Sequence, residues 1–231
     1  MATAPHVPSG SVDFGRILRY PTDDPDWIKK VLIGGAFALL SSMLIGIPFV
    51  LGYFSRTLRG AVEGASRLPE WDDLGGIFND GLRLTVVYLA YALGMALVIT
   101  VPVLAIAIPL GMLGERGADA AGAIAGLGFV VVYGLVMLLS LALAVYLPAA
   151  LTRAALRGTI GDGFAVREVL GFIRANLGNY LLALVIFLLA SFVAQFGLVL
   201  CCVGIFPASF WAYLILAAGL GETVRLNPQS L

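Results

Sequence analysis

The chain has 231 residues, of which 60% are hydrophobic and only 12% are charged, and its mean hydropathy is +0.99. About one quarter of the residues in an ordinary soluble domain are charged, so this chain cannot cover a large core with polar side chains, and most of it must contact lipid. The 14 basic residues balance the 14 acidic ones, so the chain has no overall positive field that would attract nucleic acid.

Residues 1–30 are expected to form a polar N-terminal tail with one short amphipathic helix at the membrane interface. In "SVDFGRILRYP", Ser11 can cap this helix, and the apolar side chains that follow fall on one face. That face consists of Phe14, Ile17 and Leu18. Next, "DDPDWIKK" predicts the start of a membrane helix, with Asp24 as its cap and Pro25 in the first helical position.

Residues 31–55 form the first apolar window, and "GIP" at Gly46–Pro48 interrupts it. Proline removes a backbone donor and clashes with the preceding helical turn, so the window is either one kinked span or a short helical hairpin. Basic residues near span ends favour the cytoplasmic side. The hairpin places every basic residue except Arg116 on one side of the membrane, whereas a single span divides them between both sides. We therefore prefer the hairpin and expect both termini in the cytoplasm.

The stretch "RLPEWDDLGGIFNDG" concentrates carboxylates between two apolar windows. Its spacing predicts an interfacial helix over residues 69–80, with Trp71 facing the lipid and Gly81 ending the helix. Clustered carboxylate oxygens also suit a divalent cation, but no ligand-loop spacing supports such a site, and no metal is predicted. The candidate interfacial or interaction residues of this helix are Glu70, Trp71, Asp72, Asp73 and Asp80.

Four further windows are long enough to cross a bilayer, which takes about 20 apolar residues. They are residues 84–113, 120–147, 178–200 and 205–221, and a break at "CCVGIFP" separates the last two. Gly122 and Gly126 have the spacing of a close helix-packing motif. We predict one transmembrane domain over residues 31–222, followed by a C-terminal tail at 223–231. The fold class is an all-α polytopic transmembrane helix bundle with a short N-terminal hairpin, four full spans and interfacial amphipathic helices.

A weak internal repeat relates two parts of the chain. The stretch from "GYFSRTLRGAVEG" to "DDLGGIFNDGLRLTVVYL" aligns with the stretch from "PAALTRAALRGTIG" to "REVLGFIRANLGNYLLAL". The alignment predicts a second interfacial helix on the same side of the membrane, with Arg167 and Arg174 as its candidate interaction residues. Asp72 or Asp73 is then predicted to pair with one of these arginines. The alternative is that each group is solvated singly or meets lipid headgroups.

Four segments carry a family resemblance: "RYPTDDPDWIKKVLIGG", "GYFSRTLR", "LPEWDDLGGIFNDGL" and "LPAALTRAA". They resemble an uncharacterised prokaryotic integral membrane family, known as domain of unknown function 4013. The resemblance extends from about Tyr20 to beyond Gly171, and the LPEWDD segment is its most specific part. The family has no established activity, so the resemblance implies a membrane protein and no particular site.

The predicted full spans contain no Asp, Glu, Lys, Arg or His, which are the residues that mark ion pathways and proton relays inside membranes. No catalytic residue or cofactor is predicted, and an enzyme is not expected. We expect a non-enzymatic scaffold or accessory protein of the cell (inner, cytoplasmic) membrane. The alternative is a small-solute channel or transporter, with Gln195 as its most polar span residue. Expected partners are the lipid bilayer and either another protein or a second copy of the chain, bound through the membrane helices, but no nucleic acid.

Overall fold

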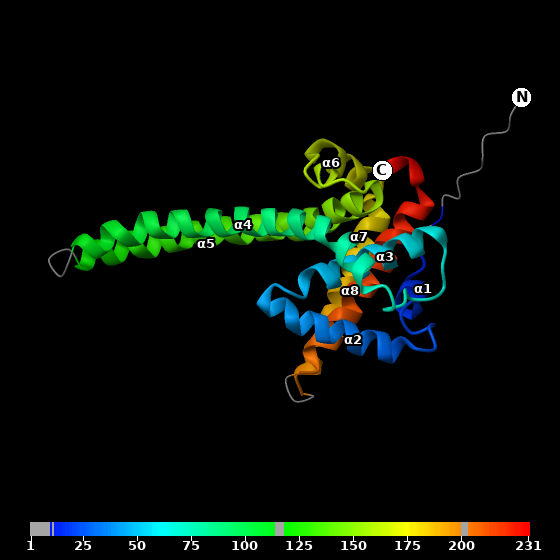
Figure 1. The fold of residues 1–231 in the computed structure, drawn as a ribbon. Coiled ribbons are helices and arrows are strands. Elements are labelled where there is room, and N and C mark those ends of the chain that lie inside the picture. Colours follow the sequence, from blue (N-terminus) through cyan, green and yellow to red (C-terminus); the bar gives the residue numbers. More distant parts are fainter. Residues whose placement is uncertain (1–9, 11, 114–117, 200–202) are drawn as a thin grey trace, which may run out of the picture. The chain divides into compact units, whose positions relative to one another are not determined.

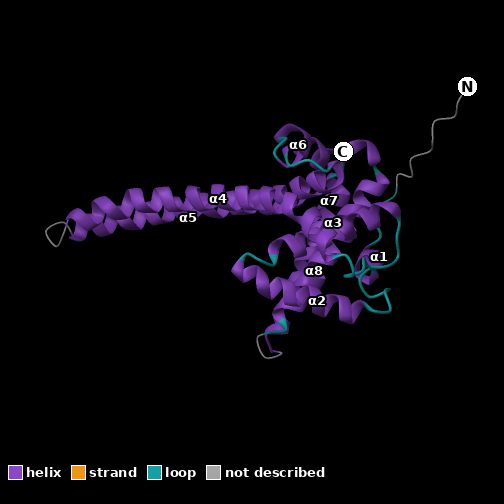
Figure 2. Ribbon diagram, viewed as in Figure 1, coloured by secondary structure: helices purple, strands orange, loops and turns teal. Residues whose placement is uncertain are grey.

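The structure, a computed structural model, describes residues 10, 12–113, 118–199 and 203–231. Every regular element in these ranges is helical, as Figure 2 shows. Helices α4, α5, α7 and α8 are each long and apolar enough to cross a membrane. These findings confirm the predicted all-α polytopic helix bundle and its four spans.

The helices begin close to the predicted windows, and α4 and α5 extend beyond theirs. The α-helices are α1 Phe14–Arg19, α2 Trp27–Leu40, α3 Ile47–Glu63, α4 Leu74–Leu113, α5 Ala118–Arg157, α6 Val166–Ala175, α7 Leu177–Gln195 and α8 Ile205–Leu226. Short 3-10 helices cover Ser41–Met43, Gly161–Gly163, Phe196–Val199 and Pro228–Ser230. Cys201 and Cys202, at the predicted break between the last two spans, lie outside the described residues.

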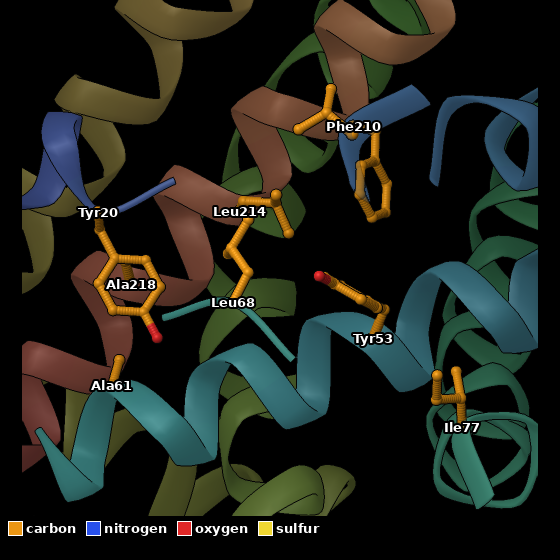
Figure 3. Packing of buried hydrophobic residues seen from close by; sticks show 9 residues of the cluster. Tyr20, Tyr53, Ala61, Leu68, Ile77, Phe210, Leu214 and Ala218 are labelled. Carbon is orange, nitrogen blue, oxygen red and sulfur yellow. The ribbon is translucent and has the colours of Figure 1, made fainter. Parts of the chain in front are cut away.

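The chain divides into two compact units, which we describe separately. The first comprises Met1–Val87 and Ala149–Leu231, and the second comprises Tyr88–Pro148. Helix α8 is the centre of the first unit, where it packs against α2, α3 and α7 (Figure 1). Its residues Phe210 and Leu214 join Tyr53 of α3 in a core of fully enclosed side chains (Figure 3). This core fixes the N-terminal hairpin against α8.

The first apolar window is a helical hairpin, as preferred from the sequence. Helix α2 ends at Leu40, and the chain then turns through a short 3-10 helix to Leu44, whose φ of 65° lies in the left-handed region. Pro48 occupies the first turn of α3, where proline removes no needed hydrogen bond. Helix α3 continues to Glu63, beyond the apolar window, so the return helix is longer than the sequence suggested.

Two predicted helix caps differ in the structure. The carboxylate of Asp13 caps α1, because it accepts hydrogen bonds from the backbone N–H groups of Gly15 at 2.8 Å and Arg16 at 3.3 Å. Ser11, the predicted cap, lies outside the described residues. Helix α2 starts at Trp27 with Asp26 in the cap position, so the prediction of Asp24 as the cap is wrong. Asp24 is instead buried beside a lysine, as described below.

The acidic stretch does not form the separate helix predicted over residues 69–80. Residues 68–73 are not helical, and α4 starts at Leu74 and runs through Gly81 without a break. Gly81 has a different physical role, because a Cβ there would overlap the carbonyl oxygen of Pro48 in α3. A Cβ on Gly52 of α3 would likewise overlap the carbonyl oxygen of Ile77. The two glycines therefore let α3 and α4 cross with their backbones in contact.

The second unit consists of parts of α4 and α5 that lie side by side. The hydroxyl groups of Tyr91 and Tyr146 are 3.3 Å apart, and their rings meet edge to face. A Cβ on Gly128 would press against Ile106, which places the two helices close together there. Apolar side chains remain exposed along both helices. They include Leu93, Leu97, Val101, Ile108, Phe129, Val131, Met137, Leu138 and Leu141.

Candidate functional site

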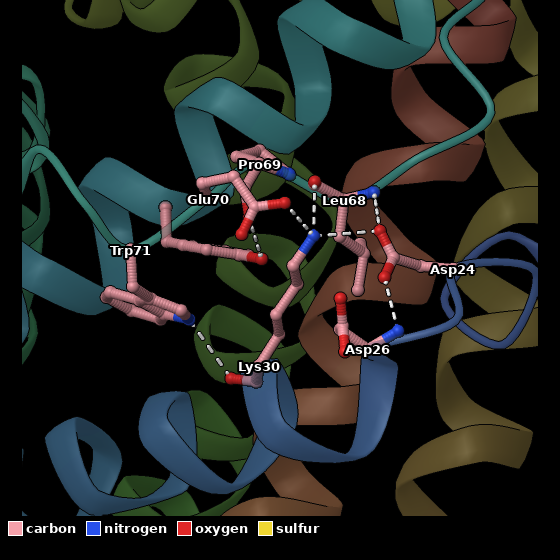
Figure 4. A network of polar contacts seen from close by, with 8 residues as sticks. Asp24, Asp26, Lys30, Leu68, Pro69, Glu70 and Trp71 are labelled. Carbon is pink, nitrogen blue, oxygen red and sulfur yellow. Dashed lines mark hydrogen bonds and ion pairs between the residues drawn. The ribbon is translucent and has the colours of Figure 1, made fainter.

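The acidic stretch meets the N-terminal hairpin at a buried lysine. The Nζ atom of Lys30, in the second turn of α2, donates to Asp24 Oδ2 at 2.9 Å, to the carbonyl oxygen of Leu68 at 3.0 Å and to Glu70 Oε1 at 2.6 Å (Figure 4). An ammonium group has three donors, and all three are used. We call Asp24, Lys30, Leu68 and Glu70 the Lys30 cluster.

Asp24 is the second buried charge of the Lys30 cluster, with 1% of its surface exposed against 3% for Lys30. Its carboxylate also accepts from the backbone N–H groups of Asp26 at 2.8 Å and Leu68 at 3.0 Å. Burial alone would raise the pKa of Asp24, but these hydrogen bonds and the charge of Lys30 outweigh it and lower the pKa below its ordinary value.

Lys30 responds to the same environment in the opposite sense. Burial alone would lower its pKa, but the bonds and charges of Asp24 and Glu70 raise it above its ordinary value. Both partners are therefore ionised at neutral pH. The cluster joins α2 to the segment before α4 through a buried ion pair whose hydrogen-bonding groups are satisfied.

Trp71, predicted to face lipid, is half-buried among aromatic side chains of the first unit. Its ring stacks on Tyr53 at a centroid distance of 4.2 Å and on Phe37 at 5.1 Å. Its Nε1 donates to the carbonyl oxygen of Lys30 at 3.1 Å. The Tyr53 hydroxyl donates to the carbonyl oxygen of Pro69 at 2.7 Å. The aromatic groups thus hold the extended acidic segment against α2 and α3.

The remaining paired carboxylates of the stretch meet arginines of α3. Arg56 Nη2 lies 2.6 Å from Asp73 Oδ2, and Arg56 Nε lies 3.1 Å from Asp80 Oδ2. Arg59 Nη1 lies 3.4 Å from Asp80 Oδ1, and Arg59 Nη2 donates to the carbonyl oxygen of Ala155 at 2.9 Å. We call Arg56, Arg59, Asp73 and Asp80 the Arg56 cluster.

Asp73 has a second role at the start of α4. Its Oδ1 accepts from the backbone N–H of Gly76 at 2.9 Å, which is the geometry of a helix cap. The hydrogen bond from Arg56 is the main reason that the pKa of Asp73 is lowered. Asp73 therefore fixes where α4 begins and ties that helix to α3.

The predicted pairing with α6 is not present in the described part of the chain. Asp73 pairs with Arg56, while Asp72, Arg167 and Arg174 are exposed and have no opposite charge within 4.0 Å among the described residues. Helix α6 is amphipathic, because it buries Val169, Phe172 and Ile173 and exposes its two arginines. Glu70, Asp73 and Asp80 of the acidic stretch pair with cations of α2 and α3 instead.

Of the two glycines in the predicted packing motif of α5, only Gly126 can be assessed, and it meets no partner among the described residues. A Cβ on Gly126 would meet nothing within 4 Å. The side chain position of Gly122 lies outside the described residues. A role for these glycines in helix packing therefore stays a prediction, and it concerns contact with another molecule.

The two clusters are suited to joining helices and offer little for chemistry. Within the described ranges, no group of three or more His, Cys, Asp and Glu side chains is arranged to hold a metal ion. The buried ionic groups already contact one another, so neither cluster presents an unused nucleophile or base. The arrangement of the two clusters supports a structural role.

The sequence interpretation missed Asp24, Lys30, Arg56 and Arg59 as members of the site. One signal was available: four carboxylates in one short stretch need cations, and "DWIKK" and "SRTLR" supply them nearby in the sequence. The internal repeat instead favoured Arg167 or Arg174 as the partner of Asp72 or Asp73, so the nearer cations were not considered.

Comparison with known proteins identifies one family. A family model described as "Protein of unknown function (DUF4013)" matches residues 36–203. No curated protein and no solved structure matches the chain.

Proposed function

Because the chain belongs to the DUF4013 family of proteins of unknown function, and its helices identify it as a multi-pass membrane protein, we propose that it is a non-enzymatic membrane scaffold or accessory protein. The observation that carries the proposal is the exposed apolar surface of the second unit. Each span contains an apolar window of 18 residues. In α4 and α5 no residue of this window is buried, whereas in α8 61% of the corresponding window is buried.

A pair of helices can bury few side chains against each other, so the rest of the apolar surface must meet lipid or other membrane helices. Association between helices in a bilayer depends on close packing and on small residues. Gly94 of α4, like Gly126 of α5, has open space where a side chain would stand. These positions support contact with a second membrane protein or a second copy of the chain.

The distribution of charge supports the same proposal. The apolar part of α4, residues 84–113, contains no Asp, Glu, Lys, Arg or His, and the ionic groups of the Lys30 and Arg56 clusters join the protein's own elements. A transport pathway needs polar groups that face a common passage. Gln195, the most polar span residue, is exposed at the end of α7, which does not favour a channel.

We place the protein in the cell (inner) membrane with both termini in the cytoplasm. The support is the hairpin of α2 and α3, which returns the chain to its starting side. With α4 and α5 as a second pair and α7 and α8 as a third, almost all basic residues fall on that side, and this side is cytoplasmic by the distribution of Lys and Arg.

A site-specific photo-crosslinker in native membranes tests the scaffold proposal. We expect a crosslinker at Val131 of α5 to give a discrete protein adduct, because this side chain is 62% exposed in the second unit. The matched control is Leu188 of α7, which is equally apolar and 63% exposed but belongs to the first unit. An adduct at neither position would contradict the proposal, and so would solute flux in proteoliposomes that Gln195→Leu abolishes.

A further inference from the structure

A small cavity lies in the first unit where α1, the end of α3 and the end of α8 meet. It has a volume of about 50 Å³ and is lined by Arg16, Ile17, Tyr20, Ala61, Gly64, Ala65, Ala218, Glu222 and Arg225. A single water molecule requires about 10–15 Å³ of such space, so the cavity has room for a group of several heavy atoms. Figure 3 shows the ring of Tyr20 beside Ala218 of α8, with Ala61 of α3 close to its hydroxyl end.

Two guanidinium groups share one carboxylate at this cavity. Glu222 is buried, with 10% of its side chain exposed, and it pairs with Arg16 of α1 and, at 2.9 Å, with Nη2 of Arg225. One positive charge is therefore uncompensated by the residues that line the cavity. The pKa of Arg16 is lowered, first by burial and then by the positive charge of Arg225, while Asp13 acts in the opposite direction. The two arginines repel each other, and a bound anion would relieve this repulsion.

Two donors at the cavity have no acceptor among the residues that the structure describes. The hydroxyl of Tyr20 and the Nε of Arg225 are buried without a hydrogen-bond partner, and Tyr20 as a whole is 8% exposed. A buried donor without an acceptor costs roughly 1–3 kcal/mol, so such groups in native proteins call for an explanation. The pKa of Tyr20 is raised to about 12, first by burial and then by the charge of Asp24, so the hydroxyl keeps its proton at neutral pH.

We propose that this cavity binds a phosphate group, with Arg16, Tyr20 and Arg225 as its donors. A phosphate offers several acceptor oxygens to a guanidinium and to a hydroxyl, and its negative charge meets the uncompensated positive one. The cavity lies at the last turns of α8 and beside an amphipathic helix, both of which suit the depth of lipid headgroups. The phosphate belongs either to a lipid headgroup or to a free phosphate ion. This inference is independent of the scaffold proposal.

The test measures the thermal unfolding midpoint of the full-length protein in detergent. Inorganic phosphate is titrated against chloride at matched ionic strength, and a phosphatidic-acid lipid is titrated against a phosphate-free glycolipid in mixed micelles. A saturating ligand at one hundred times its Kd raises the midpoint of a chain of this size by about 5–10 °C. A rise with the lipid alone identifies a headgroup site, and a rise with both identifies a site for the phosphate group itself. No rise with either would overturn the proposal.

The decisive variant is Tyr20→Phe, because it removes a hydroxyl that has no partner in the described part of the chain and keeps the ring in the core. We expect this variant to fold as the parent does and to lose at least half of the phosphate-dependent rise. Arg225→Gln should lose most of it. Arg19→Gln is the matched control, since Arg19 is an exposed arginine on α1 that does not line the cavity. An undiminished rise in Tyr20→Phe would refute the assignment even if Arg225→Gln failed to fold.

Discussion

Replacing Lys30 by methionine should destabilise the first unit more than replacing any other single charged residue of that unit. The substitution keeps the length of the side chain but removes three hydrogen bonds, to Asp24, Leu68 and Glu70. Asp24 would then be a buried carboxylate without its cation. Breaking a buried ion pair in this way costs about 3–5 kcal/mol. Because Asp24 keeps two backbone donors, we expect a loss near the lower end, about 3 kcal/mol.

The assay is thermal unfolding of the purified protein in detergent. A change of 1 kcal/mol shifts the midpoint by about 2–4 °C for a chain of this size, so Lys30→Met should lower it by about 6–12 °C. Lys29→Met is the matched control, because Lys29 is the exposed neighbour in the same helix. The double variant Asp24→Asn with Lys30→Met should recover part of the loss, since it removes the uncompensated charge. Equal midpoints for the two lysine variants would refute the argument.

Three other predictions concern the helix crossing, pH and topology. Gly81→Ala should lower stability by about 1–3 kcal/mol, because its methyl group would collide with Pro48. The control Gly75→Ala should be neutral or stabilising by up to about 1 kcal/mol. Similar unfolding midpoints for both variants would mean that α3 and α4 do not cross there. Asp24 titrates below its ordinary pKa of 3.8 and Lys30 above its ordinary pKa of 10.5, so the stabilisation by this pair should be constant between these values. This stabilisation should be lost as pH falls below about 3.8 or rises above about 10.5. If the stability of Asp24→Asn falls in acid as steeply as that of the parent protein, Asp24 is not the source of the acid loss. A cysteine placed at Ser9, with Cys201 and Cys202 replaced, should react with an impermeant maleimide only after the cells are permeabilised; labelling of intact cells would contradict a cytoplasmic N-terminus.

The sequence predicted the elements whose cause is local. Proline and glycine at Gly46–Pro48 interrupt an apolar window, and this local chemistry correctly indicated the turn between α2 and α3. The long charge-free windows likewise indicated the spans, because the requirement of the bilayer for apolar length is visible in any one segment.

The site was less predictable because its causes are distant in the sequence. Lys30 and Glu70 are 40 positions apart, and neither periodicity nor capping rules connect them. Gly81 looks like a helix end when α4 is considered alone, and only the approach of Pro48 explains why a glycine stands inside a continuous helix. Carboxylates on an amphipathic pattern fit an interface equally well, so the choice between lipid and protein partners needed the tertiary structure.

The central place of α8 has a consequence for how the protein is made. Ribosomes synthesise about 5–20 residues per second, so the segment between α3 and α8 takes on the order of ten seconds to appear. During this interval the N-terminal hairpin has left the ribosome, but α8, which contributes Phe210 and Leu214 to the core around the hairpin, does not yet exist. The hairpin must therefore wait in the insertion machinery or at the membrane surface before it reaches its final packing. A nascent chain that stops before α8 would keep the stacking of Trp71 on Phe37 and Tyr53 but would lack the contacts of Phe210 and Leu214.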